Sequence, residues 1–133
     1  MRRIAFALAT AATLLAASSL QAADKPTGEE KLARILEGRQ AGEPVNCIPL
    51  SSTYDTTIID KTAIVYDAGN VIYVNRPGNA DQLDDDLMMV SETSVGQLCK
   101  LDTIKLHDST SHSFMGFVTL EQFVPYRKAE KAY

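Results

Sequence analysis

Apolar and polar residues first alternate along the chain with the period of a helix. The apolar side chains that share one helical face are Leu32, Ile35 and Leu36. Thr27 stands before them as a helix cap, and Glu30 three residues later completes a capping box. Gly38 or Gly42 is expected to end the helix, and Pro44 then prevents the helix from resuming. The pattern predicts one short amphipathic helix, which needs a sheet to cover its apolar face.

After Pro44 the pattern becomes that of strands. The segments with strand character are residues 45–50, 58–66, 71–75, 87–90, 102–107 and 114–120. Successive apolar residues on either side of loop 67–70 predict a central hairpin that is covered on both faces. Between 102 and 107, Ile104 and Leu106 alternate with polar residues and should face the core. Phe114 is expected on that same core face, and Gly116 is a candidate bulge.

The remaining segments complete one small domain, residues 23–133. Residues 120–123 are expected to form a helical turn, and the charged end, residues 127–133, is expected to be frayed. We predict an α+β fold in which one N-terminal amphipathic helix packs on five to seven antiparallel strands. The strands should form a twisted antiparallel sheet or a partly open small β-barrel.

Residues 1–22 have the three-part layout of a secretory signal peptide. Arg2 and Arg3 give a positive start, residues 4–15 are almost wholly apolar, and small and polar residues lead to cleavage after Ala22 or Ala23. The alternative, a membrane anchor, would need about 20 apolar residues, and this run is shorter. We therefore expect a protein of the periplasm or a secreted protein, with no stable membrane insertion after the signal is removed.

Net charge narrows the range of partners. Without residues 1–22 the chain has 111 residues and a formal net charge of −6. Nucleic acids and anionic membranes attract clusters of Lys and Arg, so neither is an expected partner.

The two cysteines, Cys47 and Cys99, both lie in the part that would be exported. In an oxidising compartment, two cysteines of a small domain usually pair, so a disulfide is expected. A reactive thiol or a pair of metal ligands is the alternative, although the chain contains no Cys-x-x-Cys motif.

One loop carries a cluster of carboxylates, at Asp81, Asp84, Asp85 and Asp86. Calcium takes six to eight oxygen ligands, and such a loop could supply several of them. The loop lacks the alternate ligand positions, central glycine and terminal glutamate of an EF-hand. A solvated loop, held by an apolar contact of Leu83, is the favoured interpretation, and a divalent-cation site is the alternative.

The histidines and serines give only weak indications of a metal site or a catalytic site. His107 and His112 flank a hairpin loop, but the strand phase is expected to send them to opposite sides and not to a shared metal. The run His107-Asp108-Ser109 cannot form a catalytic triad, because neighbours on a strand point to opposite faces. No cofactor is implied, and catalysis is disfavoured without being excluded.

Aromatic and basic side chains form the last candidate site. Arg76, Tyr126 and Arg127 are of the residue types that anchor protein interfaces, so they are candidate interface residues. Tyr66 and Tyr73 are instead expected to pair across the central hairpin and pack in the sheet.

Six short segments carry a family resemblance. In order they are Cys47-Ile48-Pro49-Leu50, Ala63-Ile64-Val65-Tyr66-Asp67, Tyr73-Val74-Asn75-Arg76-Pro77, Leu83-Asp84-Asp85-Asp86, Gln97-Leu98-Cys99 and Phe123-Val124-Pro125-Tyr126-Arg127-Lys128. Together they resemble a family of small exported bacterial proteins of unknown function, over essentially the whole chain after residue 22. The resemblance implies a single exported domain with a paired-cysteine framework, and no activity, cofactor or catalytic residue.

These observations favour a non-catalytic exported domain that binds another envelope or secreted protein, or an envelope component. An inhibitor of a secreted hydrolase is one concrete form of that hypothesis. The alternative is a small divalent-cation-binding protein or cation-dependent hydrolase that uses the acidic loop. A purely structural envelope component is a third option.

Overall fold

The computed structural model describes residues 25–93 and 95–129. The expected signal peptide, residues 1–22, and the last four residues of the chain lie outside this part. Within residues 25–93 and 95–129, no helix is long and apolar enough to cross a membrane.

The described residues form one α-helix and ten strands, more than the five to seven strands predicted. The elements are α1 (Gly28–Ile35), β1 (Arg39–Ala41), β2 (Cys47–Pro49), η1 (Leu50–Ser52), β3 (Asp55–Ile59), β4 (Ala63–Asp67), β5 (Val71–Asn75), η2 (Ala80–Gln82), β6 (Leu87–Ser91), β7 (Gln97–Cys99), β8 (Thr103–Asp108), β9 (Phe114–Thr119) and β10 (Phe123–Lys128). The predicted β-rich α+β class is confirmed. The extra strands are short, and segments this short carry little periodic signal.

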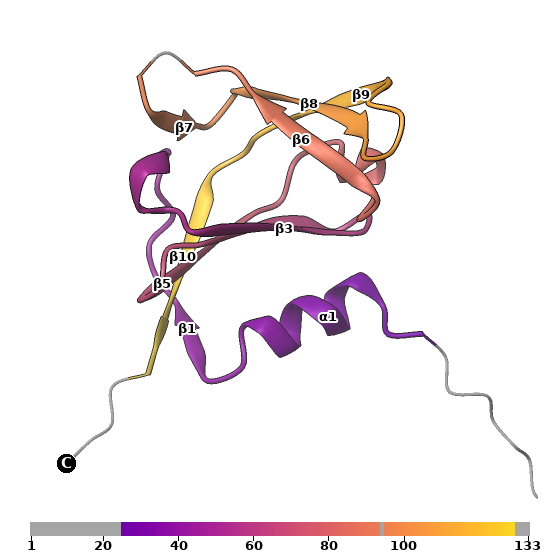
Figure 1. Cartoon of the computed structure of the whole chain (residues 1–133). Helices are drawn as coiled ribbons and strands as arrows, with labels where there is room; N and C mark the ends of the chain where they lie inside the picture. The colour runs from indigo at the N-terminus through magenta and orange to yellow at the C-terminus, as the bar shows by residue number, and fades with distance from the viewer. Residues whose placement is uncertain (1–24, 94, 130–133) are drawn as a thin grey trace, which may run out of the picture.

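All strand pairs are antiparallel, and they form three separate sheets. The largest has the order β1-β10-β5-β4-β3, a second has the order β6-β8-β9, and β2 pairs with β7 alone. The described strands therefore do not close into a barrel. Helix α1 lies on one side of the five-stranded sheet, and the two smaller sheets lie on the other (Figure 1).

The central position of the β4–β5 hairpin is confirmed. Four of the five residues of β4 are buried, because both faces of the hairpin are covered. Leu32 of α1 packs against Val65 and Val74 on one face. Tyr66, which is paired with Tyr73 as predicted, packs on the other face in the core shared with the smaller sheets.

The start of α1 fits closely over the β3–β4 turn. Thr27 Oγ1 accepts a hydrogen bond from the Glu30 N–H at 3.2 Å, so the predicted N-cap is confirmed. A Cβ atom on Gly28 would collide with the Thr62 side chain and would lie 2.9 Å from the Asp60 carbonyl oxygen. Glycine at this position therefore allows the helix to approach the turn.

The apolar content of segment 58–66 predicted a single strand, but the structure divides this segment between β3 and β4. The chain turns at Asp60–Thr62, where Lys61 has a left-handed backbone with φ 51°. The Lys61 N–H donates to the carbonyl of Leu83, and Leu83 is fully buried. This distant contact with the acidic loop fixes the turn, and it also confirms that Leu83 pins that loop.

The C-terminal segment differs from the prediction in two respects. Residues 120–122 are irregular and not helical, and β10 begins directly after them at Phe123. Arg127 and Lys128 are not frayed, because they pair with Gln40 and Arg39 of β1. Local sequence gave no sign of this pairing, since β1 is only three residues long and comes from a distant part of the chain.

Two asparagine side chains form hydrogen bonds with the backbone of β9 and of the loop that leads to β10. The Asn75 amide is fully buried; it donates to the Glu121 carbonyl at 2.7 Å and accepts from the Glu121 N–H at 3.0 Å. Asn79 likewise donates to the Phe117 carbonyl and accepts from the Thr119 N–H. Each amide thus replaces a strand partner for the backbone of β9 or the following loop.

The β8–β9 hairpin explains a wrong prediction for Phe114. Ile104 and Leu106 are buried as expected, opposite Val118 and Gly116. The pairing shifts between Leu106 and His107, and Gly116 has φ 133°, so the predicted bulge is confirmed. Because the bulge inserts one residue, the strand phase reverses and Phe114 faces outward with 61% of its surface exposed.

Candidate functional site

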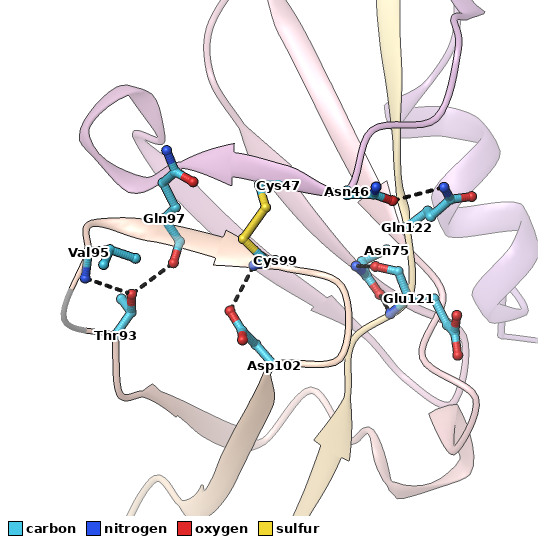
Figure 2. Close-up of a disulfide and its surroundings, with 10 residues drawn as sticks. All are labelled: Asn46, Cys47, Asn75, Thr93, Val95, Gln97, Cys99, Asp102, Glu121 and Gln122. Carbon is cyan, nitrogen blue, oxygen red and sulfur yellow. Dashed lines mark hydrogen bonds between the residues drawn. A yellow bond between two sulfur atoms is a disulfide. The ribbon is translucent and has the colours of Figure 1, made fainter.

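The two cysteines form a disulfide between strands β2 and β7, as predicted (Figure 2). The neighbouring residues Ile48 and Leu98 are buried in the core, while Cys47 is exposed. The Cys99 N–H donates to the Asp102 carboxylate at 2.8 Å. Both cysteines are oxidised, which excludes the alternatives of a reactive thiol and a cysteine metal pair in this state.

The acidic loop brings three of its four predicted carboxylates together. Oxygen atoms of Asp84, Asp85 and Asp86 lie within 4.8 Å of one another, and all three residues are exposed. Asp84 also accepts a hydrogen bond from the Asp86 N–H, which is an ordinary turn contact. Asp81 is not part of the group. Three carboxylates offer at most six oxygens, the lower end of the six to eight that calcium takes, and all three are exposed to solvent.

His107 contacts the backbone of His112 across the end of the β8–β9 hairpin. The His107 ring N–H at Nδ1 donates to the backbone carbonyl of His112 at 3.1 Å. The same ring packs edge-to-face against Phe114, with the centroids 5.8 Å apart. His107 therefore closes the hairpin end and joins an apolar surface.

Asp108 holds the β8–β9 loop and forms no triad with its neighbours. Its carboxylate accepts from the N–H groups of Thr110 and Ser111 and from the Ser111 hydroxyl. The Ser111 backbone hydrogen bond is the main reason that the pKa of Asp108 is lowered.

The structure brings two of the three candidate interface residues, Arg76 and Tyr126, together and places Arg127 elsewhere. Arg76 forms a two-pronged ion pair with Glu29 of α1, at 2.6 and 3.0 Å. Arg76 and Tyr126 share a shallow cavity of about 180 Å³, whereas Arg127 lies at a different cavity beside Gln40. Neighbours on β10 point to opposite faces, so Tyr126 and Arg127 cannot act on one surface.

An exposed apolar face, which the sequence prediction missed, covers the outside of the three-stranded sheet. Two rows of cross-strand partners run over it, Met88–His107–Phe114 and Val90–Lys105–Phe117. Met88, Phe114 and Phe117 are 39%, 61% and 51% exposed, and the bulged residue Met115 beside them is 54% exposed. We call these six residues and Met115 the outer face. The available signal was Gly116, which separates Phe114 from Phe117 in the strand pattern.

The positive charge of Lys105 at the outer face is paired with a neighbouring carboxylate. Lys105 Nζ lies 2.8 Å from a carboxylate oxygen of Glu92. The hydrogen bond and the charge of Lys105 lower the pKa of Glu92. The outer face therefore presents exposed phenylalanine and methionine side chains around Lys105, whose charge is already paired. Large exposed apolar patches of this kind commonly mark protein interaction sites.

A groove lies between α1, β3 and β6, with a volume of about 720 Å³. Its walls are residues 56–59, residues 87–89, Asp85, and Lys31, Arg34 and Ile35 of the helix. Lys31 Nζ lies 3.9 Å from the Asp85 carboxylate. The groove shares Met88 with the outer face, so the two surfaces are adjacent.

Comparison with models of protein families, with curated proteins and with solved structures gives no significant match for this chain.

Proposed function

We propose that this chain is exported, loses residues 1–22 as a signal peptide, and acts outside the cytoplasm as a non-catalytic domain that binds another protein. The outer face carries the proposal, because four large apolar side chains there are substantially exposed: Met88, Phe114, Met115 and Phe117. Exposing aromatic side chains in water is unfavourable, and Phe and Met are enriched in protein interfaces.

Export is supported by two separate features. The N-terminal residues have the layout of a signal peptide. The Cys47–Cys99 disulfide has an exposed cysteine, which a reducing cytoplasm would keep reduced. The expected mature protein begins at Ala23 or Asp24, and mass spectrometry of the protein recovered from the envelope or the medium checks this. A full-length chain that stays with the cytoplasm would contradict export.

Site-directed photo-crosslinking in the producing cell tests the binding face. A photoreactive phenylalanine analogue at position 117 should give a discrete adduct with a protein partner, and the same analogue at exposed Ser51 should not. Adding Phe114→Ser should weaken the adduct at position 117 several-fold. The same pattern of adducts at both positions would contradict a specific binding face.

The fold must survive these substitutions for the comparison to be valid. Because Phe114 and Phe117 are more than half exposed, changing either to Ser should alter the free energy of unfolding by less than about 1 kcal/mol. Urea unfolding of each variant provides this control.

Cation binding by the acidic loop is the competing hypothesis. Calorimetric titration of calcium into the wild-type protein and into Asp84→Asn/Asp86→Asn separates the two. A binding heat that the double variant loses would favour the cation site.

A further inference from the structure

A cavity of about 140 Å³ lies where the five-stranded sheet faces the smaller sheets (Figure 1). One wall is a cross-strand pair of the five-stranded sheet, Thr56 of β3 and Tyr66 of β4. The facing wall comes from the three-stranded sheet, where Ser91 of β6 is paired with Ile104 of β8. Met89 lies two residues before Ser91 and so shares its side of the strand. The cavity is therefore on the inner side of the three-stranded sheet, opposite the outer face.

The cavity has a buried floor and an open mouth. Ile104, Tyr66 and Leu98 of β7 line it and are all buried. Thr56 and Ser91 line it too, but both are exposed. A small molecule can therefore enter from the solvent between two hydroxyl-bearing side chains and reach an apolar interior.

The Tyr66 hydroxyl is the unusual group of this cavity. It makes no hydrogen bond with the residues that the structure describes, although only 3% of Tyr66 is exposed. Within the described residues, no fully enclosed side-chain nitrogen or oxygen atom lacks a partner, so the Tyr66 oxygen must meet open space. The cavity is the space that Tyr66 lines. Burial raises the pKa of Tyr66, so the hydroxyl stays protonated and offers both a donor and lone pairs there.

The rest of the lining selects the chemistry of a ligand. Its apolar members are Leu50, Met89, Leu98 and Ile104. No charged side chain is among the described residues that line the cavity, so a charged ligand would lose its hydration without gaining an ion pair. A methionine sulfur makes favourable contacts with aromatic rings. An apolar protein cavity of about 150 Å³ is large enough for benzene, so this cavity is suited to a single ring.

We propose that this cavity binds a small, neutral, single-ring aromatic molecule of the phenol class. Its ring packs against Met89 and the buried floor, and its hydroxyl group forms a hydrogen bond with the Tyr66 hydroxyl. The hydroxyls of Thr56 and Ser91 are placed to meet a second polar substituent at the mouth. This inference goes beyond the proposed function and does not depend on the outer face.

Titration of the purified, disulfide-bonded protein with phenol tests the inference, followed by NMR of the side-chain methyl groups. The methyl signals of Met89, Leu98 and Ile104 should shift and saturate, with a dissociation constant of about 1 mM or tighter. Ile72, which is buried in the other core cluster, should not shift. No saturation up to about 10 mM phenol, or shifts confined to Met115 of the outer face, would overturn the proposal.

Toluene separates the hydrogen bond from simple burial of a ring, because it has the shape of phenol without the hydroxyl group. The ratio of the toluene to the phenol dissociation constant should fall about fivefold in Tyr66→Phe, the value of one ordinary hydrogen bond. Using the ratio cancels the difference in hydration between the two ligands. An unchanged ratio would refute the contact with Tyr66 and overturn the proposal.

Tyr73→Phe is the matched control. Tyr73 is the cross-strand partner of Tyr66 but does not line the cavity, so its substitution should leave the ratio unchanged. Equal effects of the two substitutions would place phenol elsewhere and overturn the inference.

The fold should survive the substitution of Tyr66. Because its hydroxyl has no partner among the described residues, Tyr66→Phe should unfold at a urea concentration no lower than the wild type does. A clearly lower midpoint would show that the hydroxyl is bonded within the protein, which contradicts the proposal. Phe117→Ser should keep its affinity for phenol even if it loses its crosslinked partner, so failure of the cavity and failure of the outer face are distinguishable.

Benzoate tests the requirement for a neutral ligand. It has the same ring but a negative charge at neutral pH, and the lining offers no cation to pair with it. We expect at least about tenfold weaker binding than for phenol. Equal binding of benzoate and phenol would contradict the proposed class of ligand.

Discussion

Cys47 and Cys99 are direct cross-strand partners in the β2–β7 pair, with their Cα atoms 4.0 Å apart. A two-stranded ribbon of three-residue strands is marginal by itself in water. The disulfide holds this ribbon so that Ile48 and Leu98 stay buried on its inner side. It also joins segments that are 52 residues apart in sequence.

Loss of the disulfide should therefore destabilise the domain strongly. On the chain-entropy model, closing a loop of this length stabilises the folded state by about 4 kcal/mol. We expect a decrease of that order in the free energy of unfolding for Cys47→Ser/Cys99→Ser, measured by urea denaturation. Dithiothreitol should lower the stability of the wild type and leave the double variant unchanged. Equal stability of oxidised and reduced wild type would contradict this role.

The buried amide of Asn75 should be more important for stability than its polarity suggests. Asn75→Ala leaves the N–H and carbonyl of Glu121 without partners at the approach to β10. We expect a loss of about 2–3 kcal/mol in the free energy of unfolding. Asn70→Ala, in an exposed turn, is the control and should cost less than about 0.5 kcal/mol. Similar losses for the two variants would show that the Asn75 bridge is unimportant.

Gly28→Ala should destabilise the protein although alanine is the better helix former. The new methyl group would strike the Thr62 side chain and crowd the Asp60 carbonyl. Overpacking of this kind costs about 1–3 kcal/mol. The opposite exchange at an exposed site of the same helix, Ala33→Gly, should cost about 1 kcal/mol through propensity alone. Thermal unfolding measures both, and a stabilised Gly28→Ala variant would refute the close contact.

The Glu29–Arg76 ion pair should make stability depend on pH in the acidic range. The Arg76 hydrogen bond holds the pKa of Glu29 below its ordinary value of 4.5. The contribution is therefore fully present above pH 4.5 and is lost as the pH falls through the lowered pKa. Because both side chains are more than half exposed, we expect at most about 1 kcal/mol.

The difference in unfolding free energy between wild type and Glu29→Gln measures this contribution. It should be largest near pH 7 and decline steadily below pH 4.5. Exposed Glu37→Gln serves as the control. A Glu29→Gln difference that stays constant down to pH 2 would exclude the ion pair as its cause.

Much of the fold follows from local patterns in the sequence. The helix cap Thr27 marked the start of α1, and the segments with apolar residues at successive positions identified β4 and β5 as central. Alternation placed Ile104 and Leu106 inward. The disulfide was also predictable, because the chain offers only one pair of cysteines. These features depend on a residue's own neighbours, or on a choice with one outcome.

The candidate surfaces could not be predicted in the same way. A single bulged residue, Met115, moved Phe114 from the expected core to the outer face. Which side chains surround the Tyr66 hydroxyl depends on which strands pair and on how the sheets face each other, and the ordering of Arg127 depends on its pairing with β1. Sequence periodicity reports which side of a strand is apolar, because burial acts on each side chain separately. Only the tertiary structure decides which side chains of different sheets meet, because pairing and packing join segments that are distant along the chain.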